Sequence, residues 1–307
     1  MQFDISQAEN EIIEALKTTG DADEVEIAFF GGSFTGIDRE LMVYLLDTAQ
    51  KYVDLGKVDS IRLSTRPDYI DDEVLALLSR YAVKTIELGL QSMDDEVLLA
   101  SKRGHTARQG EDACRLVKKY GFDLVGQMMI GLPSSNGERE KYTAKMLCEL
   151  NVDAVRIYPT VVFYNTELCE MSKCGEYLPI SNDEAVLRTK DLLRIFDENN
   201  VPCIRVGLCA SENLASEETV YGGANHSAIG ELAMGEYFYE KMCLLLDENG
   251  GARGKSVTFY VSRGSTSKAI GQKRKNIERI LKKYSLISAK VLEKNEIIGY
   301  NIIINII

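Results

Sequence analysis

The sequence predicts an α/β protein built on a parallel sheet, and three observations support this prediction. Between residues 24 and 208, short apolar runs rich in β-branched residues alternate with segments whose apolar residues recur at helical spacing. Such strand–helix repetition forms right-handed βαβ units, in which helices cover a parallel sheet. Glycine and polar residues follow most of the expected strands. Six strands suffice for an open doubly wound sheet or for most of a barrel.

The six strands are expected at Val25–Phe30, Ser60–Ser64, Thr85–Leu90, Leu124–Ile130, Ala154–Pro159 and Cys203–Gly207. Four helix starts are expected where a Ser or Thr precedes a Glu or Gln by three positions, because this spacing forms a capping box. These starts lie at Ser6, Thr106, Ser135 and Ser181.

The composition is that of a soluble globular protein, with 45% hydrophobic and 27% charged residues among 307. No apolar run approaches the roughly 18–20 residues that a membrane span needs. The first residues form neither a basic region nor an apolar core, so we expect no signal peptide, no membrane partner and a cytoplasmic protein.

The charge is unevenly distributed along the chain. Residues 251–307 contain twelve Lys or Arg and three Glu, a net charge of +9, whereas the whole chain carries −11. Residues 1–250 therefore carry −20. A basic tail on an acidic body indicates either a polyanionic partner or a solvated basic surface.

The cysteines predict neither a disulfide framework nor a metal site. Their number is odd, their spacing is scattered and no pair stands at CxxC spacing, so most are expected to be small buried side chains. The seven are Cys114, Cys148, Cys169, Cys174, Cys203, Cys209 and Cys243. Cys169 and Cys174, at CxxxxC spacing, are weak ligand candidates.

Residues just after the strands predict a ligand site, because the carboxyl ends of parallel strands meet at one edge of the sheet. A Gly-Gly step lets a ligand approach the backbone, or it forms a tight turn. Neither a GxGxxG fingerprint nor a Walker loop is present, which disfavours the usual nucleotide folds. The site residues expected from this pattern are Gly31, Gly32, Ser33, Arg66, Gln91, Gly131 and Tyr158.

Glu87 has two interpretations. It alternates with Gly89 and Gln91 along one strand, so all three should point to the same face, where a ligand enters near its top. Alternatively, Glu87 forms a salt bridge to Arg66 or Arg156 inside the barrel.

Five linked motifs resemble the radical S-adenosylmethionine (SAM) branch that contains the catalytic subunit of Elongator and its bacterial relatives. The resemblance extends over about residues 24–200, in the family's order and spacing. The motifs are Phe29-Phe30-Gly31-Gly32-Ser33-Phe34-Thr35, Thr65-Arg66-Pro67-Asp68, Glu87-Leu88-Gly89-Leu90-Gln91-Ser92 with Arg103-Gly104-His105-Thr106, Met129-Ile130-Gly131-Leu132-Pro133 and Ile157-Tyr158-Pro159-Thr160.

The resemblance implies a partial (β/α)6 TIM-like barrel that binds SAM beside a [4Fe–4S] cluster. Gly31, Gly32 and Ser33 would hold the methionine amino group. Arg66 and Gln91 would face polar groups of SAM, and Gly131 would lie near the adenine. The family's reaction cleaves SAM reductively to a 5′-deoxyadenosyl radical.

The sequence departs from the family pattern at the cluster. The family's CxxxCxxC-type loop after the first barrel strand has no counterpart here, and cluster binding needs several converging thiolates. We therefore expect a barrel without strand 1 and a chain that is inactive without that loop. A truncated sequence or a late start is favoured over the alternative, a protein that naturally holds no cluster.

The tail contains a further pattern. After a strand expected at Val257–Val261, residues 267–280 resemble the helix–loop–helix of KH RNA-binding domains, whose GXXG loop clamps phosphates. Here the loop reads Gly-Gln-Lys-Arg. The alternative is a small α/β domain without RNA binding. The RNA-binding residues expected from the pattern are Lys268, Gly271, Lys273, Arg274 and Lys275.

These patterns predict a barrel domain over residues 1–248 and a small basic α+β domain over residues 255–307. Three functions compete: a radical SAM enzyme acting on tRNA or another RNA, a SAM- or RNA-binding module without radical chemistry, and a radical SAM enzyme for a small molecule. RNA is the expected macromolecular partner of the first.

Overall fold

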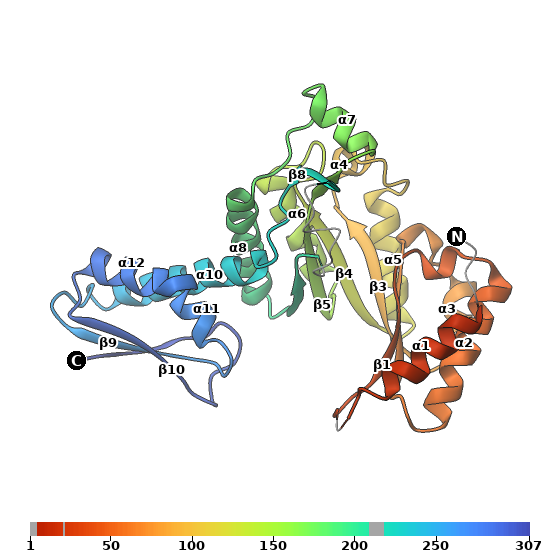
Figure 1. Cartoon of the computed structure of the whole chain (residues 1–307), viewed down its shortest axis with the longest axis horizontal. Helices are drawn as coiled ribbons and strands as arrows, with labels where there is room; N and C mark the ends of the chain where they lie inside the picture. Colours follow the sequence, from red (N-terminus) through yellow and green to blue (C-terminus); the bar gives the residue numbers. More distant parts are fainter. Residues whose placement is uncertain (1–4, 21, 209–217) are drawn as a thin grey trace. The chain divides into compact units, whose positions relative to one another are not determined.

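The computed structural model describes residues 5–20, 22–208 and 218–307, and its main feature is a curled parallel sheet that forms half of a barrel. The strand order is β1-β2-β3-β4-β5-β7 (Figure 1). All six expected strands are confirmed, as β1 Glu26–Phe29, β2 Ser60–Thr65, β3 Val83–Gln91, β4 Asp123–Ile130, β5 Ala154–Pro159 and β7 Cys203–Val206. The half-barrel is confirmed over the open doubly wound alternative.

Helices precede the first strand and connect the later ones. They are α1 Ile5–Leu16, α2 Arg39–Asp54, α3 Asp72–Leu78, α4 Asp95–Ala100, α5 Ala107–Lys119, α6 Gly137–Glu149, α7 Glu167–Lys173, α8 Asn182–Glu198 and α10 Ile229–Glu248, with short 3₁₀ turns η1 Phe34–Gly36 and η2 Pro67–Tyr69. Among the described residues, no helix combines the length and the apolarity that crossing a membrane requires.

Two of the four predicted helix caps are confirmed. The hydroxyls of Thr106 and Ser181 each accept a hydrogen bond from the backbone N–H three positions later in the chain. Thr106 also completes a capping box with Gln109. The prediction for Ser135 is wrong, because the Asn136 side chain accepts from the first N–H groups of α6 at 3.0 and 3.1 Å. Ser6 lies inside α1 rather than at its cap.

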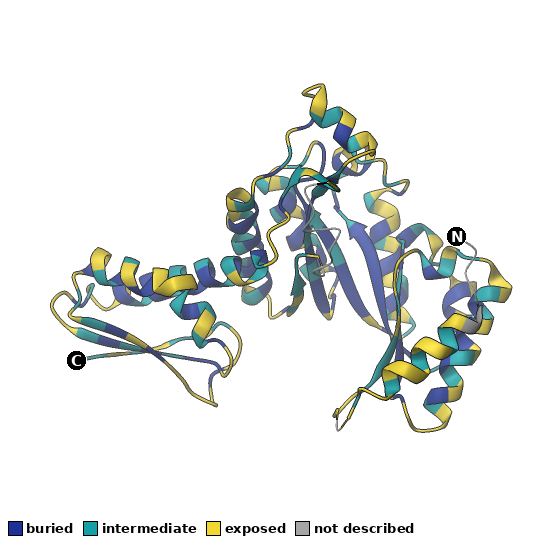
Figure 2. Cartoon of the chain, in the orientation of Figure 1, coloured by how far each residue is buried: buried dark blue, intermediate teal, exposed yellow. Residues whose placement is uncertain are grey.

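The chain divides into two compact units, one of residues 1–128 and 146–156 and the other of residues 129–145 and 157–307. In the first unit, the apolar residues of β2 and β3 form the centre of the core. Ile61, Leu63, Ile86 and Leu88 are fully buried. Figure 2 shows β3 buried along most of its length, as expected for a strand covered on both faces.

The second unit contains a two-stranded antiparallel sheet directly after β5. Strand β6, Val161–Phe163, pairs antiparallel with β8, Val220–Gly223. The two strands are closely packed against the chain before them, because a side chain at Gly223 would approach the carbonyl oxygen of Thr160 to 2.5 Å. Helices α8 and α10 bury Leu192, Phe196 and Phe238.

The end of the second unit is a three-stranded sheet with helices. Strand β9 pairs parallel with β10 and antiparallel with β11. Its elements are β9 Ser256–Val261, α11 Thr266–Ile270, η3 Gln272–Arg274, α12 Lys275–Tyr284, β10 Ser288–Glu293 and β11 Ile303–Ile306. The strand at Val257–Val261 and the following helix–loop–helix are therefore present. Helix α10 contributes Met242 and Leu246 to the same core. The division at residue 248 and the KH resemblance stay predictions.

Candidate functional site

The segment after β1 presents open backbone. Gly31 has a φ of +100°, a conformation that favours glycine. No atom lies within 4 Å of the position that a side chain at Gly31 or Gly32 would occupy. Phe34 is buried and stacks on Phe29 with ring centroids 4.5 Å apart, which anchors the segment. The Gly-Gly step therefore leaves room beside its backbone, and both the approach of a ligand and a tight turn are compatible with this geometry.

Arg66 follows β2 and is held by its own loop. Its guanidinium donates to both carboxylate oxygens of Asp68, at 2.9 and 2.7 Å, and these bonds raise the pKa of Arg66. Gly104 lies against it, because a Cβ there would stand 2.8 Å from Nη2. The hydroxyl of Thr35, after β1, meets that of Thr65, at the end of β2, at 2.7 Å. The predicted residues after these two strands therefore lie at one edge of the sheet.

Glu87 lies at the centre of a buried polar layer. Its side chain is 0% exposed, and its carboxylate accepts from Arg62 at 3.1 Å, Arg156 at 2.8 Å and Gln127 at 2.8 Å. Arg62 also donates to Glu26 on β1, at 3.0 and 2.8 Å. Of the two predicted salt-bridge partners, Arg156 is observed, whereas Arg66 binds Asp68 instead.

The polar layer extends to the glycine segment. The Arg156 guanidinium lies 5.3 Å from the ring centroid of Phe30, the exposed residue just before Gly31. Sequence reasoning missed Arg62 and Gln127, although both stand at alternate positions of strands whose neighbours are apolar. That alternation is the signal that would have identified them.

Gln91 ends β3 with a φ of +64°, which is uncommon for a residue other than glycine. The register with β4 shifts between Gly89 and Gln91. The side chain of Gln91 folds back, so that its Nε2 would lie 2.8 Å from a Cβ at Gly89. A Cβ at Gly89 would therefore displace the end of the Gln91 side chain, and Gln91 occupies the face expected from the strand alternation.

His105 contacts the backbone at this end of β3. It is 6% exposed, and its Nε2 lies 3.2 Å from the carbonyl oxygen of Leu90. Its Nδ1 is buried without a hydrogen-bond partner among the described residues. Burial lowers the pKa of His105, an effect that Asp68 opposes and that Arg66 and Arg103 reinforce. The neutral ring therefore donates through Nε2 and holds Leu90, next to Gln91.

His105 should make the free energy of unfolding depend on pH. A histidine whose pKa is depressed in the folded state favours folding above its unfolded pKa of about 6.5, and this stability is lost as the pH falls toward the folded pKa. Urea titrations at pH 5–8 should show a steeper loss below pH 6.5 for the wild type than for His105→Gln, which keeps an Nε2 donor. The only other histidine, exposed His226, supplies the control His226→Asn. Equal pH dependence in the wild type and His105→Gln would contradict this role.

In the second unit, Gly131 follows β4 in a turn that is bonded on both sides. Its N–H donates to Glu140 Oε1 at 2.8 Å, and its carbonyl accepts from the Tyr177 hydroxyl at 2.5 Å. With a φ of +75°, it also packs closely on Ile180, because a Cβ would lie 2.6 Å from Cγ2. Only glycine fits this position.

Glu140 is the buried centre of this turn. It is 2% exposed, and Oε1 also accepts from Ser135 and Arg188, each at 2.9 Å. Oε2 is buried without a partner among the described residues. Burial raises the pKa of Glu140, whereas the bonds from Gly131, Arg188 and Ser135 oppose the rise. The sequence contains no signal that distinguishes Glu140 from a surface glutamate.

The remaining predicted rim residue, Tyr158, is half-buried on β5. Thr160, two residues later, donates through its hydroxyl to the carbonyl of Ile130 at 2.7 Å. This bond joins the end of β5 to the residue before Gly131. In the second unit, Gly131 and Tyr158 thus lie at the ends of adjacent strands.

The cysteines in the described part of the chain do not form a cluster site. No group of three or more His, Cys, Asp or Glu among the described residues is arranged to hold a metal ion. Burial raises the pKa of Cys114 to about 12 and that of Cys148 to about 11, so both stay protonated at neutral pH. Cys169 is buried and Cys174 exposed. Cys209 lies outside the described residues. These residues thus offer no ligand set for a [4Fe–4S] cluster.

The predicted RNA-binding residues come together at one turn. Gly271 has a φ of +76°, and Lys273 and Arg274 have φ of +51° and +64°. Lys273 and Arg274 are exposed and Lys268 is half-buried. Lys275 lies 3.5 Å from Glu236 on α10. The turn therefore presents a cluster of cationic side chains.

Comparison with known proteins gives consistent matches. The family model described as the Radical SAM superfamily matches residues 5–147, and that of the Radical_SAM C-terminal domain matches residues 152–239. The tRNA uridine(34) acetyltransferase of Methanocaldococcus jannaschii is 31% identical over 195 residues, which are 57% of this chain and 36% of that protein. Human Elongator complex protein 3 matches with the same identity and coverage.

A solved structure agrees with the fold. The archaeal Methanocaldococcus infernus Elp3 with an N-terminal deletion superposes with a TM-score of 0.62 and 25% identity, over 80% of this chain and 59% of that one. The chain spans just over a third of the length of these two curated relatives. Because the two family models together extend from residue 5 to residue 239, and the half-barrel agrees with them, this chain belongs to the radical SAM superfamily, with homologues among the Elongator complex protein 3 and tRNA uridine(34) acetyltransferase proteins.

Proposed function

We propose that this chain binds SAM at the carboxyl ends of its parallel strands and belongs to a radical SAM enzyme that modifies tRNA. The open backbone at Gly31 and Gly32 carries this proposal, because space is left where any side chain would stand. A methionine amino group fits there, with Ser33 as a further polar contact. The family's enzymes use SAM and a [4Fe–4S] cluster, and the tRNA is inferred from the relatives' names.

The other predicted site residues have distinct roles in this proposal. Arg66, fixed by Asp68, and Gln91, fixed through Gly89 and His105, orient the polar groups of SAM. Glu87 has an indirect role, because it fixes the position of the Arg156 guanidinium. Such groups are oriented before the ligand arrives, which reduces the cost of ordering them on binding.

In the second unit, Gly131 is assigned a place near the adenine, and Tyr158 is assigned to the same cofactor site. SAM and the cluster, when bound, would supply the radical chemistry of the family, the one-electron reductive cleavage of SAM. We assign the SAM-binding part of this chemistry to the described residues, among which no group of three or more His, Cys, Asp or Glu could hold a metal ion.

The RNA partner is proposed to bind through the basic tail. Single-stranded nucleic acids bind positively charged grooves, because the contacts release counterions from the phosphates. The contacts are assigned to Lys268, Gly271, Lys273, Arg274 and Lys275, within a region of net charge +9. We propose a cytoplasmic location, which is compatible with a tRNA substrate.

The SAM site is tested by filling the open backbone. Gly32→Leu should abolish SAM binding measured by equilibrium dialysis, because the new side chain occupies the ligand's space. The thermal unfolding temperature should change little, since no atom lies within 4 Å of the new Cβ. The control Gly137→Leu also extends into open space, at the start of α6, and should bind SAM like the wild type. Wild-type SAM affinity in Gly32→Leu would overturn the proposed site.

A further inference from the structure

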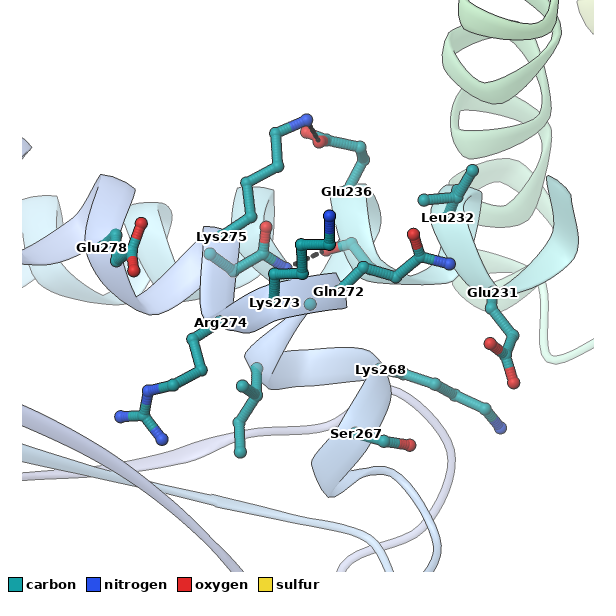
Figure 3. A pocket seen from close by; sticks show the side chains of 14 residues that line it. Glu231, Leu232, Glu236, Ser267, Lys268, Gln272, Lys273, Arg274, Lys275 and Glu278 are labelled. Carbon is teal, nitrogen blue, oxygen red and sulfur yellow. Dashed lines mark hydrogen bonds and ion pairs between the residues drawn. The ribbon is translucent and has the colours of Figure 1, made fainter. Parts of the chain in front are cut away.

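A cavity of about 710 Å³ lies between α10 and the turn after α11 (Figure 3). This volume is within the range of about 300–1,000 Å³ that small-molecule sites occupy. One wall is the turn from Gly271 to Lys275, and the opposite wall is the first half of α10, with Glu231, Leu232 and Gly235. The cavity therefore joins the predicted RNA-binding turn to a helix that sequence analysis did not assign to it.

The turn is held in an unusual conformation. Gly271 has φ +76° and ψ 158°, a region available essentially to glycine alone, and Lys273 and Arg274 are both left-handed. Asn276 holds this shape. It is 2% exposed and donates to the carbonyls of Gly235, at 2.8 Å, and Ala269, at 3.2 Å. Strained backbone persists where the surroundings over-determine it, and it is often associated with binding.

The cavity is lined by side chains of both positive and negative charge. Among the described residues, no ion pair includes Lys268, Lys273 or Arg274 at the turn, Glu231 on α10 or Glu278 on α12. Glu236, by contrast, is neutralised by Arg279 at 2.7 Å and by Lys275. Hydrogen-bond donors and acceptors that form no ion pair among the described residues thus line the same cavity. Such a site suits a ligand that combines an anion with hydrogen-bond donors.

Figure 3 shows that the uncommitted cations spread out from the turn. The side chains of Arg274 and Lys268 extend to opposite sides of it, rather than toward one point. A single small anion would need the cations to converge. An extended polyanion, by contrast, meets them one after another along its length.

We propose that this cavity binds one nucleotide of a single-stranded RNA. The phosphates lie along Lys268, Lys273 and Arg274, and the ribose 2′-hydroxyl donates to the carboxylate of Glu231 or Glu278. A 2′-hydroxyl is the group by which a protein distinguishes RNA from DNA. This inference rests on the proposed function for its partner and adds the means of selecting ribose.

The test compares a 12-nucleotide single-stranded RNA with the deoxyribose strand of identical bases, by fluorescence anisotropy with the full chain. The wild type should bind the RNA about tenfold or more tightly than the DNA, because a hydrogen bond to a charged acceptor is lost with the 2′-hydroxyl. Glu231→Gln/Glu278→Gln should remove most of this preference. Lys273→Gln/Arg274→Gln should weaken both strands and reduce the salt slope by about 1.4, for two phosphate contacts.

The control Lys282→Gln/Lys283→Gln removes the same charge from the exposed far end of α12 and should leave the RNA preference and most of the affinity intact. All six substituted residues are exposed, so thermal unfolding should confirm that each variant folds.

Three outcomes would overturn the inference while leaving the SAM site standing. The first is that Glu231→Gln/Glu278→Gln tightens RNA and DNA equally, which would make the carboxylates mere sources of repulsion. The second is that Lys282→Gln/Lys283→Gln weakens binding as much as Lys273→Gln/Arg274→Gln. The third is that AMP competes as strongly as the 12-mer, which would indicate a free nucleotide. If the wild type binds neither strand, the RNA partner fails together with this inference.

Discussion

Replacing Glu87 with alanine should lower the free energy of unfolding by about 3–5 kcal/mol, because it leaves buried cations without their counter-ion. Arg62 and Arg156 both donate to this fully buried carboxylate. Arg62 keeps Glu26, but the observed interactions of the Arg156 guanidinium are with Glu87 and the Phe30 ring. Urea denaturation monitored by circular dichroism measures the change.

The control for this prediction is Glu26→Ala. Glu26 binds Arg62 from β1 and is 22% exposed, so water can replace its carboxylate. Its loss should cost about 1 kcal/mol, as for other partly exposed pairs. If Glu87→Ala cost no more than Glu26→Ala, the polar layer would not depend on its central carboxylate. A large loss of stability in Glu87→Ala would measure the cost of leaving the buried arginines without their counter-ion. It would not show that the polar layer stabilises the fold more than apolar residues of the same size would.

Replacing Glu140 with alanine should have a comparable effect on stability, about 3–5 kcal/mol, and should also weaken SAM binding by about tenfold or more. The substitution removes the acceptor of Gly131, Ser135 and Arg188 at once. The turn after β4 then loses the bond that fixes its N–H, although Tyr177 still holds the carbonyl. Urea denaturation and equilibrium dialysis of SAM measure the two effects.

Glu184→Ala provides the matched control, because Glu184 pairs with the same Arg188 from a position that is 50% exposed. Its loss should cost at most about 1 kcal/mol and leave SAM affinity unchanged. If Glu140→Ala lowers the stability but leaves the SAM affinity at the wild-type value, the turn after β4 does not contribute to SAM binding. Glu140 would then be a structural residue only.

The apolar periodicity was sufficient to predict the strands, because each strand of a parallel sheet is buried along a short continuous run of its own residues. Each of the six predicted ranges overlaps its observed strand. Helix caps were less reliable. Ser135 has the right spacing to Glu138, but Asn136, one residue later, accepts the N–H bonds, and Ser135 turns toward Glu140. Local spacing cannot distinguish neighbouring side chains that compete for the same donors.

The sequence by itself determined the α/β class, the positions of the strands and the glycine and polar residues at the strand ends, because these depend on short-range patterns. The tertiary structure decided which partners those residues meet. Arg62 instead of Arg66 joins Arg156 at Glu87, and Glu140 lies nine residues from Gly131. Asn276 reaches Gly235 across 41 positions. Such contacts depend on how strands and helices pack together, and no local pattern records that packing.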